Sequence, residues 1–189
     1  MMENISNEER LRYITEMIRN AKQNVARGGS FQILLWGYVI AFANFGHFAL
    51  QKINFYAPYV VWLIVIPALV VSVVYSIRQS KKAQVVGYLD RMYGLIWLAA
   101  FIAILTVLVF MVELNFHHNP VILLFASIAT FVTGMLLKFR PVIVGAIVLW
   151  VGAVVSFMVP VVDQYLIGGI AIIFGYIVPG TLLRKAERG

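Results

Sequence analysis

Six long apolar stretches alternate with short polar segments along most of the chain. Each is close to the roughly 20 residues that an α-helix needs to cross a hydrocarbon core about 30 Å thick. None of them contains Asp, Glu, Lys or Arg. The stretches are residues 31–50, 59–77, 92–112, 120–137, 141–159 and 165–183. The pattern predicts an all-α integral membrane protein whose six transmembrane helices form one domain over residues 31–183.

The first 30 residues follow a different pattern. Apolar residues recur there at spacings of three and four, which is typical of an amphipathic helix. They are Leu11, Ile14, Ile18, Ala21 and Val25. The Gly-Gly-Ser segment 28–30 follows, and we expect it to break the helix before the first span. We expect residues 1–30 to lie on the membrane or on the inner ends of the bundle, with docking of a cytoplasmic protein to residues 6–25 as the alternative.

The six stretches pair into three tandem helical hairpins of similar layout. Odd-numbered stretches each carry a Trp after Leu or Ile, and even-numbered stretches each end at a basic residue. These residues are Trp36, Trp97 and Trp150, and Arg78, Lys138 and Arg184. Two of the three hairpin tips carry Asn-Phe followed shortly by Pro, in segments 54–58 and 115–120. Asn favours turns and Pro starts helices, so we expect tight turns at headgroup level with their polar residues facing water.

Basic residues separate into two unequal groups. Of the 15 Lys and Arg residues, all except Lys52 lie in the N-terminal segment, the second and fourth connections or the C-terminal tail 184–189. Basic residues near span ends stay on the cytoplasmic side. We therefore expect a cell (inner) membrane protein with both termini in the cytoplasm. The net charge of +7 also favours contact with anionic lipid headgroups, whereas a nucleic-acid partner is not expected.

Small residues recur along the last three stretches. Such residues let membrane helices approach closely. The predicted packing residues are Ala126, Thr130, Gly134, Gly145, Gly152, Ala171 and Gly175. We expect them to form contacts within the chain, and a homo-oligomer stays open as the alternative.

Titratable side chains are rare in the apolar stretches. Apart from tyrosines, His47, near the outer end of the first stretch, is the one that occurs there, and the other histidines fall in the second tip. We expect ordinary loop histidines. Two alternatives are a metal site, since imidazole and carboxylate are zinc ligands, and a response to acid outside the cell, since imidazole normally titrates near pH 6.5. The candidate ligands are His47, His117, His118, Glu113 and Asp163.

Catalytic and cofactor-binding patterns are not evident in the chain. Cysteine does not occur, which excludes disulfides and thiolate chemistry. The sequence also lacks the GxSxG, HExxH and P-loop motifs that typify several enzyme classes. We therefore expect no enzyme and no cofactor, but a polytopic membrane protein with a structural, sensory or regulatory role. A small-molecule permease or a channel subunit is the alternative.

Part of the chain resembles known membrane proteins. The residues that carry the likeness are Gly29-Ser30-Phe31, Leu34-Leu35-Trp36-Gly37 and Gly46-His47-Phe48. They resemble a group of small six-span bacterial membrane proteins that carries no assigned activity. The three hairpins, with Trp in the odd spans and Pro at the tips, are similar to the HdeD-type acid-resistance membrane family. That likeness implies a fold more than a function.

Overall fold

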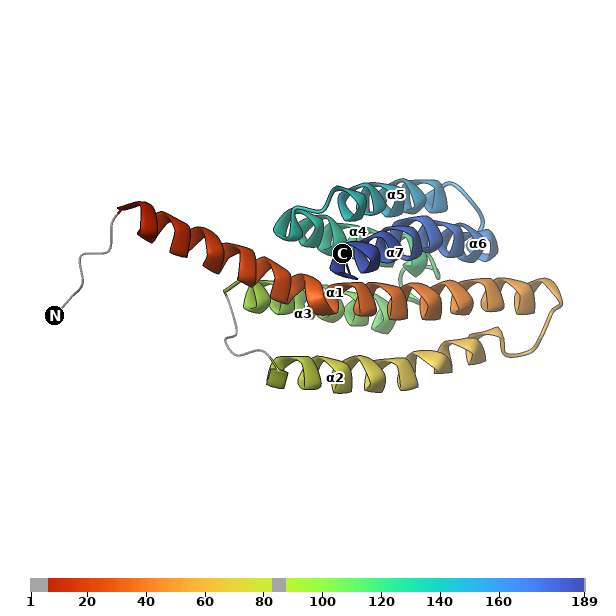
Figure 1. The fold of residues 1–189 in the computed structure, drawn as a ribbon. Coiled ribbons are helices and arrows are strands. Elements are labelled where there is room, and N and C mark those ends of the chain that lie inside the picture. Colours follow the sequence, from red (N-terminus) through yellow and green to blue (C-terminus); the bar gives the residue numbers. More distant parts are fainter. Residues whose placement is uncertain (1–6, 83–87, 189) are drawn as a thin grey trace.

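The computed structural model describes the backbone of residues 7–82 and 88–188, with the side chains of residues 12, 29–81 and 91–187. These residues form helices joined by short turns (Figure 1). The elements are α1 (Asn7–Lys52), η1 (Pro58–Ile64, a 3₁₀ helix), α2 (Val65–Lys82), α3 (Tyr88–Val109), α4 (His118–Leu137), α5 (Arg140–Phe157), α6 (Val161–Ile172), η2 (Ile173–Ile177, a π-helical segment) and α7 (Val178–Arg188).

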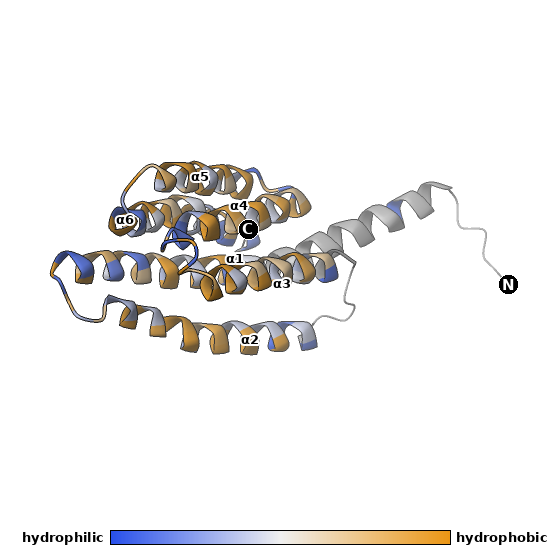
Figure 2. Cartoon of the chain, turned by 180° about the vertical axis from the view of Figure 1, so that it is seen from behind, coloured by the Kyte–Doolittle hydropathy of each residue, from blue (hydrophilic) through white to orange (hydrophobic). Residues whose placement is uncertain are grey.

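Six helical segments are long and apolar enough to cross a membrane, so the predicted class of fold is confirmed. Apolar residues cover the helices along their length, and hydrophilic residues gather toward the helix ends (Figure 2). A helix satisfies its own backbone hydrogen bonds, and this is why such segments are helical in lipid. The three successive helix pairs pack as hairpins, with the widest contact between α4 and α5 of neighbouring hairpins.

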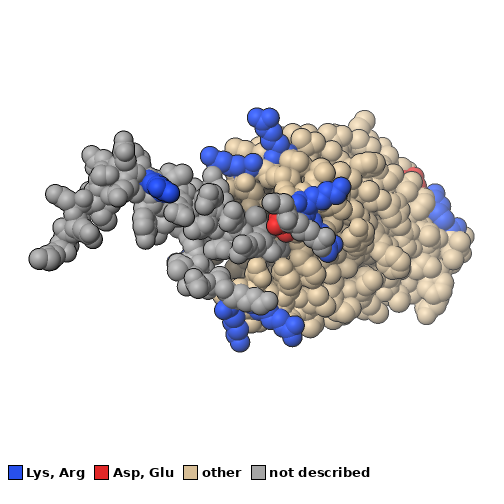
Figure 3. Space-filling view, in the orientation of Figure 1, with Lys and Arg blue, Asp and Glu red and all other residues tan. Residues whose placement is uncertain are grey.

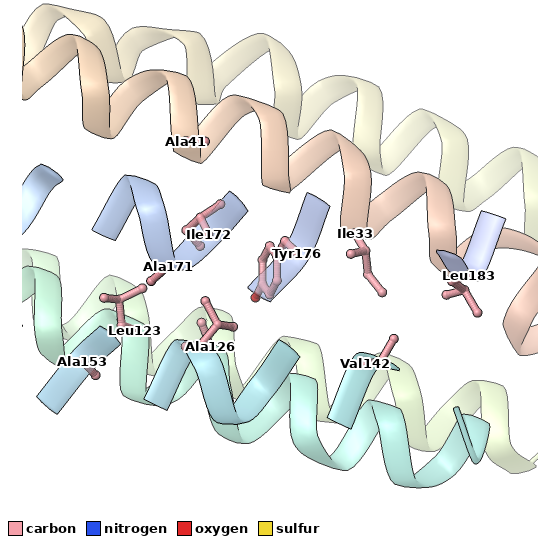
Figure 4. Close-up of a cluster of buried hydrophobic side chains, with 11 residues drawn as sticks. Ile33, Ala41, Leu123, Ala126, Val142, Ala153, Ala171, Ile172, Tyr176 and Leu183 are labelled. Carbon is pink, nitrogen blue, oxygen red and sulfur yellow. The ribbon is translucent and has the colours of Figure 1, made fainter. Parts of the chain in front are cut away.

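The hairpins contribute unequally to the core. Only 6% of the residues in the apolar windows of the second and third spans are buried within the fold, against 50% for the sixth span. The core lies between α1, α4, α5 and the continuous helix α6–η2–α7 (Figure 4). Its members include Ile33, Leu123, Val142, Leu149 and Tyr176. Helix α2 contacts α1 and η1, so α1 separates it from the rest of the bundle (Figure 1).

The predicted helix break at residues 28–30 is wrong. Helix α1 runs through this segment, and its first part extends beyond the ends of the other helices (Figure 1). Gly29 is buried and faces Leu183 of α7. The Ser30 amide donates to Glu187 Oε1 at 3.1 Å, and its hydroxyl donates to the same carboxylate. Packing and these bonds offset the cost of helical glycine, which is only about 0.5–1 kcal/mol per residue.

Two further sequence predictions need comment at the ends of the chain. Residues 184–188 continue α7 instead of forming a separate tail. The stripe Leu11, Ile14, Ile18, Ala21 and Val25 lies on the helical backbone of α1, but these side chains are outside the described residues. Docking of a partner to residues 6–25 therefore stays a prediction.

Irregular helix precedes the prolines inside the second and sixth spans. Pro67 follows the 3₁₀ helix η1, and Pro179 follows the π-helical segment η2. Proline has no N–H and its ring collides with the carbonyl four residues earlier. Local changes of helix type relieve that collision.

The Asn-Phe pair of the first tip ends helix α1. Asn54 has a left-handed backbone, with φ of 53°. Its amide donates to Gln51 O at 3.0 Å, and the amide of Phe55 donates to Leu50 O at 2.9 Å. These two bonds define a Schellman cap, which satisfies carbonyls that the helix leaves open.

The second tip repeats this cap. Asn115 has φ of 47°, and its amide donates to Val112 O at 2.9 Å. The amide of Phe116 donates to Met111 O, also at 2.9 Å. The two Asn-Phe pairs therefore make the same two backbone bonds, but the second pair lies in the turn beyond the end of α3, and its Phe116 is left-handed as well, with φ of 63°.

Candidate functional site

Buried polar side chains gather at the end of the bundle that holds turns 53–57, 110–117 and 158–160, which we call the tip end. They come from the last turns of α1, the first turns of α4 and α6, and η1. We define the tip cluster as Asn44, His47, Trp62, His118, Asn119, Gln164 and Tyr165. Apart from the half-buried Trp62, all of these residues are buried.

Three amide side chains lie together in the cluster, and that of Asn119 in α4 links α1 with α6. Asn119 Nδ2 donates to Asn44 Oδ1 at 3.0 Å and to the backbone oxygen of Gln164 at 3.2 Å. Asn44 Nδ2 donates to Ile40 O at 2.9 Å, and Gln164 Nε2 donates to Val159 O at 3.3 Å. Buried polar groups need such partners, so these bonds fix the relative positions of the three helices.

A glycine makes room for the amides. A Cβ atom at Gly168 of α6 would lie 2.8 Å from Asn44 Oδ1 and 3.0 Å from Asn119 Oδ1. Distances below about 3 Å are not tolerated without movement of the neighbours. Glycine at this position therefore allows α6 to approach the Asn44–Asn119 pair.

Four aromatic rings form the second half of the cluster. The His47 and Tyr165 rings stack with centroids 3.9 Å apart, and the Tyr165 hydroxyl lies 3.3 Å from His118 Nε2. Trp62 Nε1 donates to His47 Nδ1 at 3.0 Å. Indole N–H is only a donor, so Nδ1 of His47 acts as the acceptor. We infer that the imidazole is neutral, with its proton on Nε2.

Several buried polar atoms lack a partner among the described residues. At the tip end they are Gln51 Oε1, His118 Nδ1, Gln164 Oε1 and, in the last turn of α5, Ser156 Oγ. Leaving a buried donor or acceptor unpaired costs about 1–3 kcal/mol. The amide and imidazole groups of the cluster are thus not fully satisfied by protein atoms.

Charged residues lie around the rim of the cluster. Lys52 Nζ is 3.4 Å from Asp163 Oδ1 and lies over the ring of Phe48 at 5.2 Å from its centroid. Glu113 is exposed in the second tip. This rim is more exposed to solvent than the buried cluster beneath it, because the Lys52 and Asp163 side chains are 56% and 39% exposed.

The two adjacent histidines have different environments. His117 Nδ1 lies 3.0 Å from Asn115 O in an exposed contact, whereas His118 is 9% exposed and belongs to the cluster. Asn119 is also buried. The expectation that the polar residues of this tip face water is therefore wrong for His118 and Asn119. They lie in the first turn of α4, which starts before Pro120 and packs into the bundle.

The five candidate metal ligands do not converge on one point. His47 and His118 both contact Tyr165, Asp163 pairs with Lys52, and His117 and Glu113 lie in the second tip. Within residues that the structure describes, no group of three or more His, Asp or Glu side chains is placed to hold an ion. Zinc takes about four ligands in a tetrahedron, and the cluster does not supply them.

The seven predicted packing residues are all buried, mostly between the last two hairpins. A Cβ at Gly145 would lie 2.4 Å from Gly175 O, and one at Gly152 would lie 2.5 Å from the Ala171 side chain. Gly134 faces Ile143. Thr130 donates to Ala126 O at 2.7 Å and lies 3.3 Å from the Tyr176 hydroxyl.

Sequence reasoning missed several members of the cluster. Trp62, Asn119, Gln164 and Tyr165 were not singled out, although each is a polar or amphipathic residue near a tip. An available signal was the recurrence of Asn and Gln at the same end of the first, fourth and sixth helices. No protein-family model, curated protein or solved structure matches the chain.

Proposed function

We propose that this chain is a non-enzymatic, multi-pass membrane protein with a structural, sensory or regulatory role. The close packing of α4, α5 and the α6–η2–α7 helix carries this proposal. At Gly145 and Gly175 the helix backbones are so close that a methyl group would overlap the opposite carbonyl. Such packing leaves little room for a solute path between these helices and favours a rigid bundle.

The tip cluster supports the same role. Its hydrogen bonds join three helices at one end, which holds the bundle in a single arrangement. Two surface hollows lie elsewhere, one on α2 and one between α5 and α7, and both are lined mainly by apolar atoms. Apolar hollows of this kind suit lipid chains better than polar substrates.

We also propose that the end opposite the tips faces the cytoplasm of a bacterial cell, in its inner membrane. Lys and Arg gather at that end (Figure 3), whereas the described tip end contributes Lys52. The positive-inside rule supports this orientation. The basic end would then meet anionic lipid headgroups.

A permease or channel subunit is the second candidate. The π-helical segment η2 favours it, since π segments often occur at functional sites. Purified protein in liposomes decides between the two candidates. We expect no ion or small-solute flux above that of protein-free liposomes. Reproducible flux that changes in the packing variant Gly152→Leu, with the variant still folded, contradicts the proposal.

A further inference from the structure

Segment η1 packs along α1, and its contacts there include one hydrogen bond, one close apolar contact and the edge-on approach of the Trp62 and His47 rings, whose centroids are 6.4 Å apart. Trp62 Nε1 donates to His47 Nδ1 at 3.0 Å. Val61 lies over Gly46, where an added Cβ would be 2.8 Å from Val61 Cγ1. Ala57, which precedes η1, is only 2% exposed. The segment thus docks at the last turns of α1, over the tip cluster.

The hydrogen bond depends on the protonation state of His47. A neutral imidazole has one nitrogen that accepts, but an imidazolium ion has two donors and no acceptor. If Nδ1 takes a proton, two N–H groups face each other at the position of the present bond. The Trp62–His47 bond can then no longer form, whereas the neighbouring Val61–Gly46 contact is unaffected directly.

The other groups around His47 offer little compensation for a positive charge. Tyr165 of α6 stacks on its ring, and His118 of α4 lies beyond Tyr165 as a second imidazole. On α6 the carboxylate of Asp163 already pairs with Lys52 of α1. The titratable group on η1 itself is Tyr59, which is exposed.

We propose that Nδ1 of His47 is a proton-binding site, and that occupation of this site releases η1 from α1. The proton comes from hydronium in the medium at the tip end: its O–H bond breaks, water is released, and a new N–H bond forms at the lone pair of Nδ1. The freed Trp62 N–H then bonds to water or headgroup oxygen at this depth. This property goes beyond the proposed function, because a rigid bundle without any pH response would still be non-conducting.

Accessibility of a thiol at residue 57 tests the proposal. The chain has no cysteine, so Ala57→Cys introduces a single thiol at a buried position directly before η1. Tyr56→Cys is the matched control, because Tyr56 is 88% exposed. Both variants are labelled in detergent micelles with a water-soluble methanethiosulfonate, at about pH 7.5 and about pH 5, on either side of normal imidazole titration. The ratio of the two rates largely removes the effect of pH on thiolate content.

We expect the labelling ratio, which is the labelling rate of Cys at residue 57 divided by that at residue 56, to rise about tenfold at the lower pH. A rise of this size is expected for a site coupled to one proton. His47→Asn retains an acceptor for Trp62 but does not titrate, so it should keep the ratio low at both pH values. Gly46→Ala displaces Val61 without changing any titratable group, so it should raise the ratio at both. His118→Gln should leave the pH response in place.

Three results would overturn the proposal. One is a ratio that is equal at both pH values, and another is an unchanged response in His47→Asn. The third is loss of the response in His118→Gln, which would assign it to the other imidazole. If His47→Asn does not fold, Trp62→Phe replaces it. Removal of the indole donor should raise the labelling ratio at neutral pH and abolish its dependence on pH. A ratio that still depends on pH in this variant contradicts the proposal.

Discussion

Asn115 is the residue on which the shape of the second tip depends. Its backbone is left-handed, and the amides of Asn115 and Phe116 close the turn after α3. Side chains that branch at Cβ strain this conformation, whereas Asn and Gly adopt it readily. The same reasoning applies to Asn54, while Lys138 performs this role in the turn between α4 and α5.

We predict that Asn115→Val destabilises the protein by about 1–2 kcal/mol, the cost of placing an ordinary residue in the left-handed region. Asn115→Gly should be neutral or slightly stabilising, because glycine has no Cβ to strain. Thermal unfolding of the purified protein in detergent measures both. Equal stability of the Val and Gly variants would show that the turn tolerates any residue at this position.

Gly168 allows a second residue-scale prediction. Gly168→Ala places a methyl group against the Asn44–Asn119 pair, and overpacking of this kind typically costs about 1–3 kcal/mol. Gly94→Ala is the matched control, since no atom of the described residues lies within 4 Å of its added Cβ. It should be neutral or stabilising because alanine favours helix. A Gly168→Ala variant as stable as Gly94→Ala would contradict the close approach of α6.

At the scale of elements, α2 is the least anchored helix. Its polar connection to α1 is a reciprocal pair, in which Ser72 Oγ donates to Gln32 Oε1 at 2.7 Å and Gln32 Nε2 donates to Ser72 O at 3.1 Å. The Phe31 and Tyr75 rings stack beside it, with centroids 4.0 Å apart. These contacts decide whether α2 stays on α1, because α2 shares little buried surface with the core.

We predict that Ser72→Ala lowers stability by about 1 kcal/mol, a typical value for hydrogen bonds between membrane helices. The loss arises partly because Gln32 Oε1 is left without its donor. In the double variant Gln32→Leu/Ser72→Ala no polar group is left unpaired, so part of the loss should be recovered. Thermal unfolding of the wild type, the single variants Ser72→Ala and Gln32→Leu, and the double variant tests this. A double variant whose loss equals the sum of the two single losses would contradict it.

The element scale also shows where sequence patterns succeed and fail. Apolar stretches predict spanning helices because a helix in lipid must satisfy its own backbone. They do not predict that α1 continues through residues 28–30, because Leu183 and Glu187, which stabilise that segment, lie more than 150 residues later in the chain. The propensity of glycine to end a helix is local, and packing against α7 overrides it.

The tip cluster shows the same limit for the candidate site. The depth of His47 and the position of the second tip indicate that these histidines share one end of the bundle. Burial of His118 but not His117 follows from the point at which α4 begins, which the pattern places at Pro120 instead of His118. The contact of Tyr165 with both imidazoles depends on the rotation of α6, which the apolar pattern leaves undetermined because that helix is apolar on most sides.

For the whole molecule, the uneven distribution of Lys and Arg between the two ends predicts its direction in the membrane. We expect Ser80→Cys to resist membrane-impermeant thiol reagents in intact cells, and Asn115→Cys to react, because their ends of the bundle face opposite sides. Both positions are exposed in the structure. The opposite labelling pattern refutes the proposed orientation, and labelling of both sites indicates mixed insertion.

Hydrogen bonds between the first, fourth and sixth spans have a consequence for biosynthesis. Asn44 enters the membrane when its partner Asn119 is still 75 residues from being added, and Gln164 follows later. Polar side chains in a lone span are costly in lipid. The first hairpin therefore lacks the donor for Asn44 Oδ1 until α4 is added, and Asn119 gains its second acceptor, the Gln164 backbone oxygen, only when α6 arrives. A ribosome that stalls before α4 would leave a nascent chain whose Asn44 side-chain oxygen has no donor, which membrane quality control can recognise.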